Sequence, residues 1–203
     1  MKRILLFILL LIGLAGCATL SVQPCGEELA RPYFFEKGEN LVAFRMMLQA
    51  KEQQIEAILQ IKKIAEETYD ITVFSTAGAY RMLQVTLTRE EAKYSFLVPS
   101  ADHAVVRIKA ERFFKLLLFP SQSIGKCNIK KGQRQVAYKH SPMVYTYDME
   151  EDYPQRLTGP KSFGKVYLTF EDYEPYEDTQ LPHQLHYKDG KIQADLTLLR
   201  LKK

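Results

Sequence analysis

The feature that most constrains this fold is a two-residue alternation of apolar and polar side chains that begins at Leu41. Phe44 and Met46 share one side of an extended chain, and Arg45 falls on the other side. The next segment repeats the pattern, with Leu59 on its apolar side. Side chains alternate between the two faces of a β-strand, so this pattern predicts antiparallel strands that are buried on one face.

The same alternation predicts further strands along the chain. They are expected at residues 69–74, 82–87, 94–98, 153–157, 166–170, 184–187 and 192–201. Gly78 marks a turn between two of them, and Asp189-Gly190 is a strong hairpin signal. Short strands separated by regular turns favour an all-β barrel or sandwich. The acidic segment 171–180 reads as a solvated loop between strands.

One segment departs from the strand pattern. Residues 110–119 read AERFFKLLLF, and Pro120 follows. Their apolar side chains would wrap most of a helix, which Pro120 would stop. A helix of this kind must be covered on nearly every side, and the concave face of a curved sheet is the simplest cover.

The first sixteen residues have the layout of an export signal. Lys2 and Arg3 precede an apolar run that is too short to cross a bilayer comfortably. The run ends in the sequence LAGC, which finishes at Cys17 and resembles the bacterial lipobox. That resemblance implies cleavage before Cys17 and lipid attachment to its thiol. An ordinary cleaved signal with a chance cysteine is the alternative reading.

Charge and cysteine usage narrow the class of protein. The formal net charge of the whole chain is +4, and Lys2 and Arg3 belong to the leader, so the exported part is closer to neutral. We therefore expect no nucleic-acid partner. The basic residues within 126–139 fit a solvated loop and strand edge, or a contact with anionic lipid headgroups. An oxidising compartment allows a disulfide between Cys25 and Cys127, and two free thiols are the alternative.

Two stretches of the chain resemble a known family. In the tail, YPQRL, GKVYLTFEDYEP, LPHQLHYKDGKI and LTLLRL occur in this order, and DITVFSTAGAYRMLQVTL forms the second stretch. Both resemble the Lol lipoprotein-carrier superfamily, which includes a periplasmic carrier (LolA) and an outer-membrane receptor (LolB). The resemblance implies a half-open antiparallel β-barrel with a helical lid and an apolar hollow that takes up acyl chains.

The resemblance also implies a domain organisation and a location. Residues 1–16 would be the leader, 17–28 the lipidated tether, and 29–203 a single half-barrel domain. The protein would be anchored by lipid to the outer membrane and face the periplasm. Its partners would be that membrane, the acyl chains of a lipid or lipoprotein, and a periplasmic carrier protein.

Within the resemblance, particular residues acquire expected roles. Phe113, Phe114 and Leu117 would form the lid. Ala77 stands where the receptor has an exposed Leu in a protruding loop, so Ala77, Gly78, Ala79 and Tyr80 would face the membrane, with Tyr80 as a substitute aromatic. The acyl cavity would be lined by Phe44, Met46, Leu59, Val85, Phe96, Leu168 and Leu196. The same positions could instead form a solid core.

Catalytic motifs are not evident in the sequence. It contains neither a Gly-rich phosphate loop nor a G-x-S-x-G nucleophile elbow. His183 and His186 lie three residues apart in an expected strand, which points them to opposite faces and disfavours a metal site. We expect no enzyme activity, no metal and no cofactor. Two functions remain, a lipid or lipoprotein transfer factor and a structural lipoprotein that docks another envelope protein through a solid β-domain.

Overall fold

The computed structural model describes residues 23–24, 34–35, 38–50, 53–78, 80–119, 126–130, 133–140, 143–150, 153–159, 166–177 and 179–202. The leader, Cys17, Cys25 and Ala79 lie outside these residues, so the expectations about them remain predictions. Within the described part of the chain, no helix is long and apolar enough to cross a membrane.

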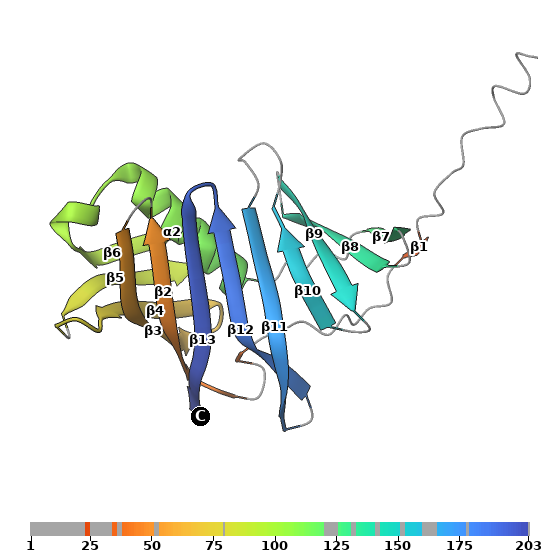
Figure 1. The fold of residues 1–203 in the computed structure, drawn as a ribbon, viewed down its shortest axis with the longest axis horizontal. Coiled ribbons are helices and arrows are strands. Elements are labelled where there is room, and N and C mark those ends of the chain that lie inside the picture. Colours follow the sequence, from red (N-terminus) through yellow and green to blue (C-terminus); the bar gives the residue numbers. More distant parts are fainter. Residues whose placement is uncertain are drawn as a thin grey trace, which may run out of the picture.

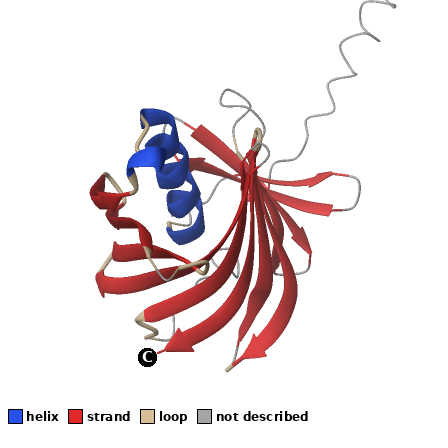
Figure 2. Cartoon of the chain, turned by 60° about the vertical axis from the view of Figure 1, so that its left-hand side comes forward, coloured by secondary structure: helices blue, strands red, loops and turns tan. Residues whose placement is uncertain are grey.

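Within the described residues, a single antiparallel sheet of 13 strands forms most of the fold (Figure 1). Its neighbours follow the order β1-β7-β8-β9-β10-β11-β12-β13-β2-β3-β4-β5-β6. The strands are β1 (Gln23–Pro24), β2 (Leu41–Ala50), β3 (Gln53–Ala65), β4 (Thr68–Ser75), β5 (Arg81–Thr88), β6 (Ala92–Leu97), β7 (Lys126–Lys130), β8 (Gln133–His140), β9 (Met143–Glu150), β10 (Tyr153–Thr158), β11 (Val166–Tyr176), β12 (Thr179–Asp189) and β13 (Ile192–Lys202). The sheet curves strongly (Figure 2). It does not close into a barrel, because β1 and β6 remain as its two edges.

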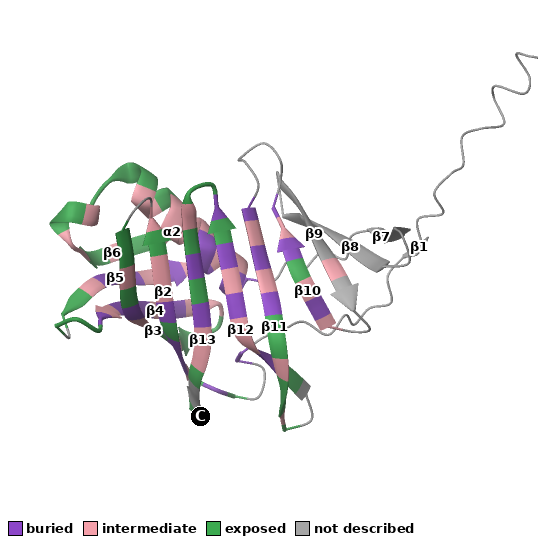
Figure 3. Cartoon of the chain, in the orientation of Figure 1, coloured by how far each residue is buried: buried purple, intermediate pink, exposed green. Residues whose placement is uncertain are grey.

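The pairing of β13 with β2 joins the two ends of the domain. β13 is the last strand of the chain, and it lies between β12 and β2 near the middle of the sheet. Its register places Leu196 beside Met46 and Leu198 beside Phe44. Phe44 in turn lies opposite Leu59 on β3. Alternate positions along β11, β12 and β13 are buried, as Figure 3 shows. The register aligns such apolar positions on neighbouring strands in rows across the sheet.

The helix α2 (Ala104–Leu118) covers this concave face, as Figure 2 shows. A short 3₁₀ turn, η1 (Pro99–Ala101), leads into it from β6. Phe113, Phe114, Leu117 and Leu118 are buried against the sheet. The helix ends before Phe119, whose backbone dihedrals are not helical, because a residue that precedes a proline avoids the α conformation. The predicted helix and its cover are thus confirmed, although the helix begins earlier than residue 110.

Two segments that read as loops form strands. β11 and β12 continue past the core as a two-stranded ribbon, where Tyr176 pairs with Thr179. Most side chains of the ribbon are exposed, so its sequence has no need of the apolar alternation that marks the other strands. Backbone hydrogen bonds between the two strands hold the ribbon together. The Tyr173 hydroxyl also donates a 2.6 Å hydrogen bond to the Pro154 carbonyl. The basic stretch 126–139, which the sequence indicated as a loop and strand edge, contributes β7 and most of β8.

Phe96 is the one expected inward residue that faces the wrong way. Tyr94 pairs with Val85 and Phe96 pairs with Gln84, so Ser95 is an extra residue on β6. Such a β-bulge reverses the alternation beyond it. Tyr94 and Leu97 therefore pack against the core, whereas Phe96 is 40% exposed.

Candidate functional site

An apolar cavity of about 150 Å³ lies between α2 and the concave face of the sheet. It is partly open to solvent. The lining comes from six strands, η1 and α2, and comprises Met46, Leu48, Val73, Met82, Leu83, Leu97, Val98, Ala101, Val106, Lys109, Ala110, Phe113, Phe114, Tyr187, Ile192 and Ala194. The curvature of the sheet creates this space because one helix does not fill the whole hollow.

The lining is almost entirely carbon. Among the described residues that form it, Lys109 alone carries a charge, and its methylene stem supplies the contact. Met46 and Met82 add unbranched side chains that adapt to irregular apolar guests. A cavity of this composition excludes polar chemistry and suits a hydrocarbon group.

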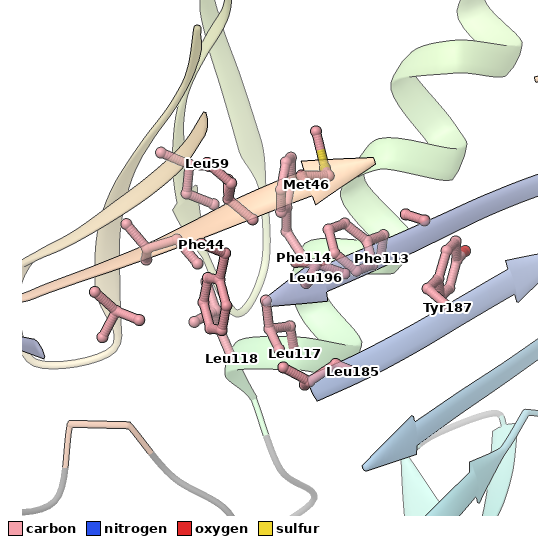
Figure 4. Close-up of a cluster of buried hydrophobic side chains, with 14 of the residues drawn as sticks. Phe44, Met46, Leu59, Phe113, Phe114, Leu117, Leu118, Leu185, Tyr187 and Leu196 are labelled. Atoms are coloured by element: carbon pink, nitrogen blue, oxygen red, sulfur yellow. The ribbon is translucent and has the colours of Figure 1, made fainter. Parts of the chain in front are cut away.

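The cavity occupies only part of the apolar hollow that the family resemblance implied. Of the seven residues expected to line it, Met46 is on the wall. Phe44, Leu59, Val85, Leu168 and Leu196 are buried in the hydrophobic core and do not line the cavity. Figure 4 shows Phe44, Leu59 and Leu196 among the core side chains. Of the expected lid, Phe113 and Phe114 reach the wall, and Leu117 packs into the core.

Several wall residues were missed because they precede the apolar helix signal. Val98 immediately precedes η1, Ala101 is the last residue of η1, and Val106 lies in the first turn of α2. Val105 and Ile108, on the same turns, are largely exposed. The available signal was the spacing of Val106, Ala110 and Phe113, which are four and three residues apart and share one face of a helix.

A buried carboxylate fastens α2 to the hairpin between β12 and β13. Asp189 is 3% exposed, and its Oδ1 lies 3.0 Å from Lys109 Nζ. Its Oδ2 accepts hydrogen bonds from Arg112 at 3.1 Å and from the Tyr187 hydroxyl at 3.4 Å. Lys109 Nζ also donates to the Asp189 carbonyl at 3.1 Å. Gly190, with φ +63°, makes the tight turn that follows, as the hairpin signal predicted.

A second contact ties α2 to the edge strand β6. The Tyr94 hydroxyl donates a 2.8 Å hydrogen bond to the Arg107 carbonyl, and the Arg107 guanidinium lies 5.0 Å from the centre of the Tyr94 ring. Burial raises the pKa of Tyr94 to about 12, with a further contribution from Glu111. The phenol therefore stays neutral and keeps donating well above physiological pH.

The remaining expected positions show no convergent chemistry. Ala77, Gly78 and Tyr80 are exposed between β4 and β5, and their contact with a membrane stays a prediction. His186 lies 2.8 Å from Asp195, and His183 lies 3.6 Å from Glu174, each on the surface of the ribbon strands. In the described residues, no group of three or more His, Cys, Asp or Glu side chains is placed to hold a metal ion.

An open, curved antiparallel sheet with a helix across its concave face defines a half-open β-barrel with a helical lid. A LolA superfamily protein from Nitrosomonas europaea shares this fold, with a TM-score of 0.51 and 9% sequence identity over 83% of this chain and 87% of that chain. A putative outer membrane lipoprotein-sorting protein domain from Vibrio parahaemolyticus gives a TM-score of 0.46 at 12% identity over 81% of this chain and 85% of that chain.

The first of these similarities confirms the LolA/LolB-like fold that the sequence motifs indicated. At this identity it establishes the fold and leaves function to be argued from the site. No protein-family model and no curated protein matches the sequence.

Proposed function

We propose that this chain is a lipid-anchored outer-membrane protein that faces the periplasm and takes part in lipoprotein or lipid transfer. It binds an acyl chain in the cavity under α2. The observation that carries the proposal is the apolar cavity itself, which lies between a separate helix and an open sheet. The LolA/LolB-like fold and the lipobox-like sequence LAGC, which ends at Cys17, support it.

The cavity favours a hydrocarbon guest on energetic grounds. Each buried methylene contributes about 0.8 kcal/mol, so burial of about eight methylenes contributes about 6 kcal/mol. A cavity of about 150 Å³ is smaller than the 300–1,000 Å³ that is typical of ligand sites. A long chain would therefore extend through the open side or displace part of α2.

A solid-core structural lipoprotein is the second candidate. It is favoured by the dense packing of Phe44, Leu59 and Leu168, each of which is fully buried away from the cavity. In this reading the half-barrel docks a protein partner, and the small cavity is a packing imperfection. Binding of a hydrocarbon separates the two candidates.

Filling the cavity tests the proposal directly. Ala110 lines the cavity, so Ala110→Leu adds three carbons to the space that an acyl chain would occupy. We expect the affinity for the neutral apolar dye N-phenyl-1-naphthylamine, and for palmitate that displaces it, to fall by about tenfold or more, since each lost methylene is worth about 0.8 kcal/mol. The assay uses the chain without its first seventeen residues and follows dye fluorescence.

Ala104→Leu is the matched control, because Ala104 is exposed on the same helix. This variant should bind as the unmodified chain does. Filling a cavity does not destabilise a fold as a buried charge would, so urea denaturation should show that both variants are folded. A folded, unmodified chain that binds neither dye nor palmitate would favour the structural candidate.

The anchor is tested at Cys17. Only a thiol accepts the diacylglycerol in the lipobox pathway that the LAGC sequence implies. Cys17→Ser should therefore abolish metabolic labelling with palmitate and leave the protein out of the outer-membrane fraction. Cys127→Ser, which leaves the lipobox intact, should label normally. Full labelling of Cys17→Ser would disprove lipidation at this residue.

A further inference from the structure

The rim of the cavity carries a cluster of two cations and one carboxylate. Lys109 and Arg112 lie three residues apart on α2, on the face that meets the β12–β13 hairpin. Both bind the same carboxylate, that of Asp189. One carboxylate is thus shared between two cations, and of these two cations Lys109 is the one that lines the cavity.

The other cations of α2 have carboxylates of their own. Arg107 pairs with Asp102 at 2.7 Å, and Lys115 pairs with Glu111 at 2.7 Å. Lys109 differs from Arg107 and Lys115 because it shares its carboxylate with a second cation and lies in the cavity wall. Lys109 has a side chain that is 26% exposed, so a ligand can approach it from solvent.

Lys109 is also the residue that connects the cluster to the cavity. Its stem forms part of the apolar wall, and its ammonium lies outside that wall on Asp189. The two contacts with Asp189 use two of the three N–H donors of the ammonium. An apolar cavity that ends at an ammonium group matches a molecule with a hydrocarbon chain and an anionic head.

We propose that Lys109 binds the anionic headgroup, carboxylate or phosphate, of an amphiphile whose acyl chain occupies the cavity. This inference rests on the proposed acyl-chain binding and adds a headgroup preference to it. The third N–H of Lys109 donates a charge-assisted hydrogen bond to the headgroup oxygen, and Arg112 and Tyr187 keep Asp189 in place beside it. A neutral headgroup gains no such contact.

Matched photoactivatable lipids provide the test. The full chain is placed in nanodiscs of neutral phosphatidylcholine and exposed to three probes with the same diazirine-bearing acyl chain. The probes are the free fatty acid, the lysophosphatidic acid and the monoacylglycerol. Mass spectrometry measures how much of each tail crosslinks to peptides of α2 that line the cavity. We expect the anionic probes to crosslink about fivefold more than the neutral one at low salt, and this preference to shrink at high salt.

Variants then assign the preference to one side chain. Lys109→Gln keeps most of the stem and removes the charge, so it should lower crosslinking of the anionic probes to the level of the monoacylglycerol. Lys115→Gln, which removes a cation from the same helix away from the cavity, should retain the preference. The comparison of headgroups and salt in the unmodified chain needs no variant, so the test stands even if Lys109→Gln folds poorly.

Each outcome separates the inference from the function on which it rests. Equal crosslinking of all three probes, or a preference that Lys109→Gln leaves intact, overturns the headgroup site and leaves acyl-chain binding standing. No crosslinking of any probe to α2 in folded protein overturns both. A preference for the carboxylate alone or for the phosphate alone supports the site and identifies which headgroup it takes.

Discussion

The free-energy cost of introducing a charged side chain differs greatly between buried and exposed positions of the sheet. Leu168 on β11 is 0% exposed and belongs to the packed core. Phe96 on β6 is an aromatic residue that looks equally buried in the sequence, but the bulge at Ser95 turns it outward. Comparing substitutions at these two residues therefore tests whether the β-bulge is present.

Replacing each of these residues with glutamate should separate them. Leu168→Glu buries a carboxylate among apolar side chains, and we expect the free energy of unfolding to fall by about 4 kcal/mol or more. Phe96→Glu places the charge in solvent and should change the free energy of unfolding by less than about 1 kcal/mol. Urea denaturation followed by circular dichroism measures both. Severe destabilisation by Phe96→Glu would mean that β6 lacks the bulge.

At the scale of elements, α2 depends on contacts at both ends of its cavity-lining region. Asp189 fastens the helix to the β12–β13 hairpin, and Tyr94 fastens it to β6. The cavity lies between α2 and the sheet in the same region, where Val106 and Ala110 line it. The two contacts therefore help to hold α2 over the cavity.

The Tyr94 contact predicts a dependence of stability on alkaline pH. The pKa of Tyr94 is raised to about 12 in the folded protein, above the 10.0 of an unperturbed tyrosine. Folding thus favours the protonated phenol, and this contribution is complete below pH 10 and is lost as pH rises from 10 towards 12. Stability should fall less between pH 9.5 and 11 in Tyr94→Phe than in the unmodified chain.

Urea denaturation at each pH measures that difference. Identical pH profiles for Tyr94→Phe and the unmodified chain would show that the Tyr94 phenol is not protected in the folded protein.

At the scale of the whole molecule, the sheet brings distant parts of the chain together. β1 lies at one edge and pairs with β7, so that Gln23 is opposite Cys127. Cys25 follows Pro24, the last residue of β1, and so lies close in sequence to a strand that pairs beside Cys127. If it forms, the predicted disulfide would join the N-terminal segment to the edge of the sheet.

The disulfide prediction can be tested on gels. If Cys25 and Cys127 are bonded, the chain without its first seventeen residues should migrate faster before reduction than after it, because a loop of about a hundred residues is closed. Closure of such a loop stabilises a fold by about 4–5 kcal/mol in the chain-entropy model, so Cys25→Ser should lower the free energy of unfolding under oxidising conditions only. Free alkylation of both thiols in the native, oxidised protein would refute the bond.

Much of this fold follows from the sequence because the relevant signals are local. The alternation around Phe44 and Leu59 defines strands and their buried faces, since side chains of a strand point to alternate sides. Gly190 follows a strand residue and permits the positive φ of a tight hairpin. The apolar run around Phe113 requires a helix that the sheet covers.

Only the tertiary structure decided where the candidate site lies. The cavity is the volume that remains between α2 and six strands, and no local pattern records how well groups far apart in the chain fill the space between them. The contact of Lys109 with Asp189 joins residues 80 positions apart, so neither residue's neighbours in sequence reveal it. The bulge at Ser95 likewise depends on pairing with β5. Periodicity is a property of a segment, whereas a cavity and its charged rim are properties of the packed whole.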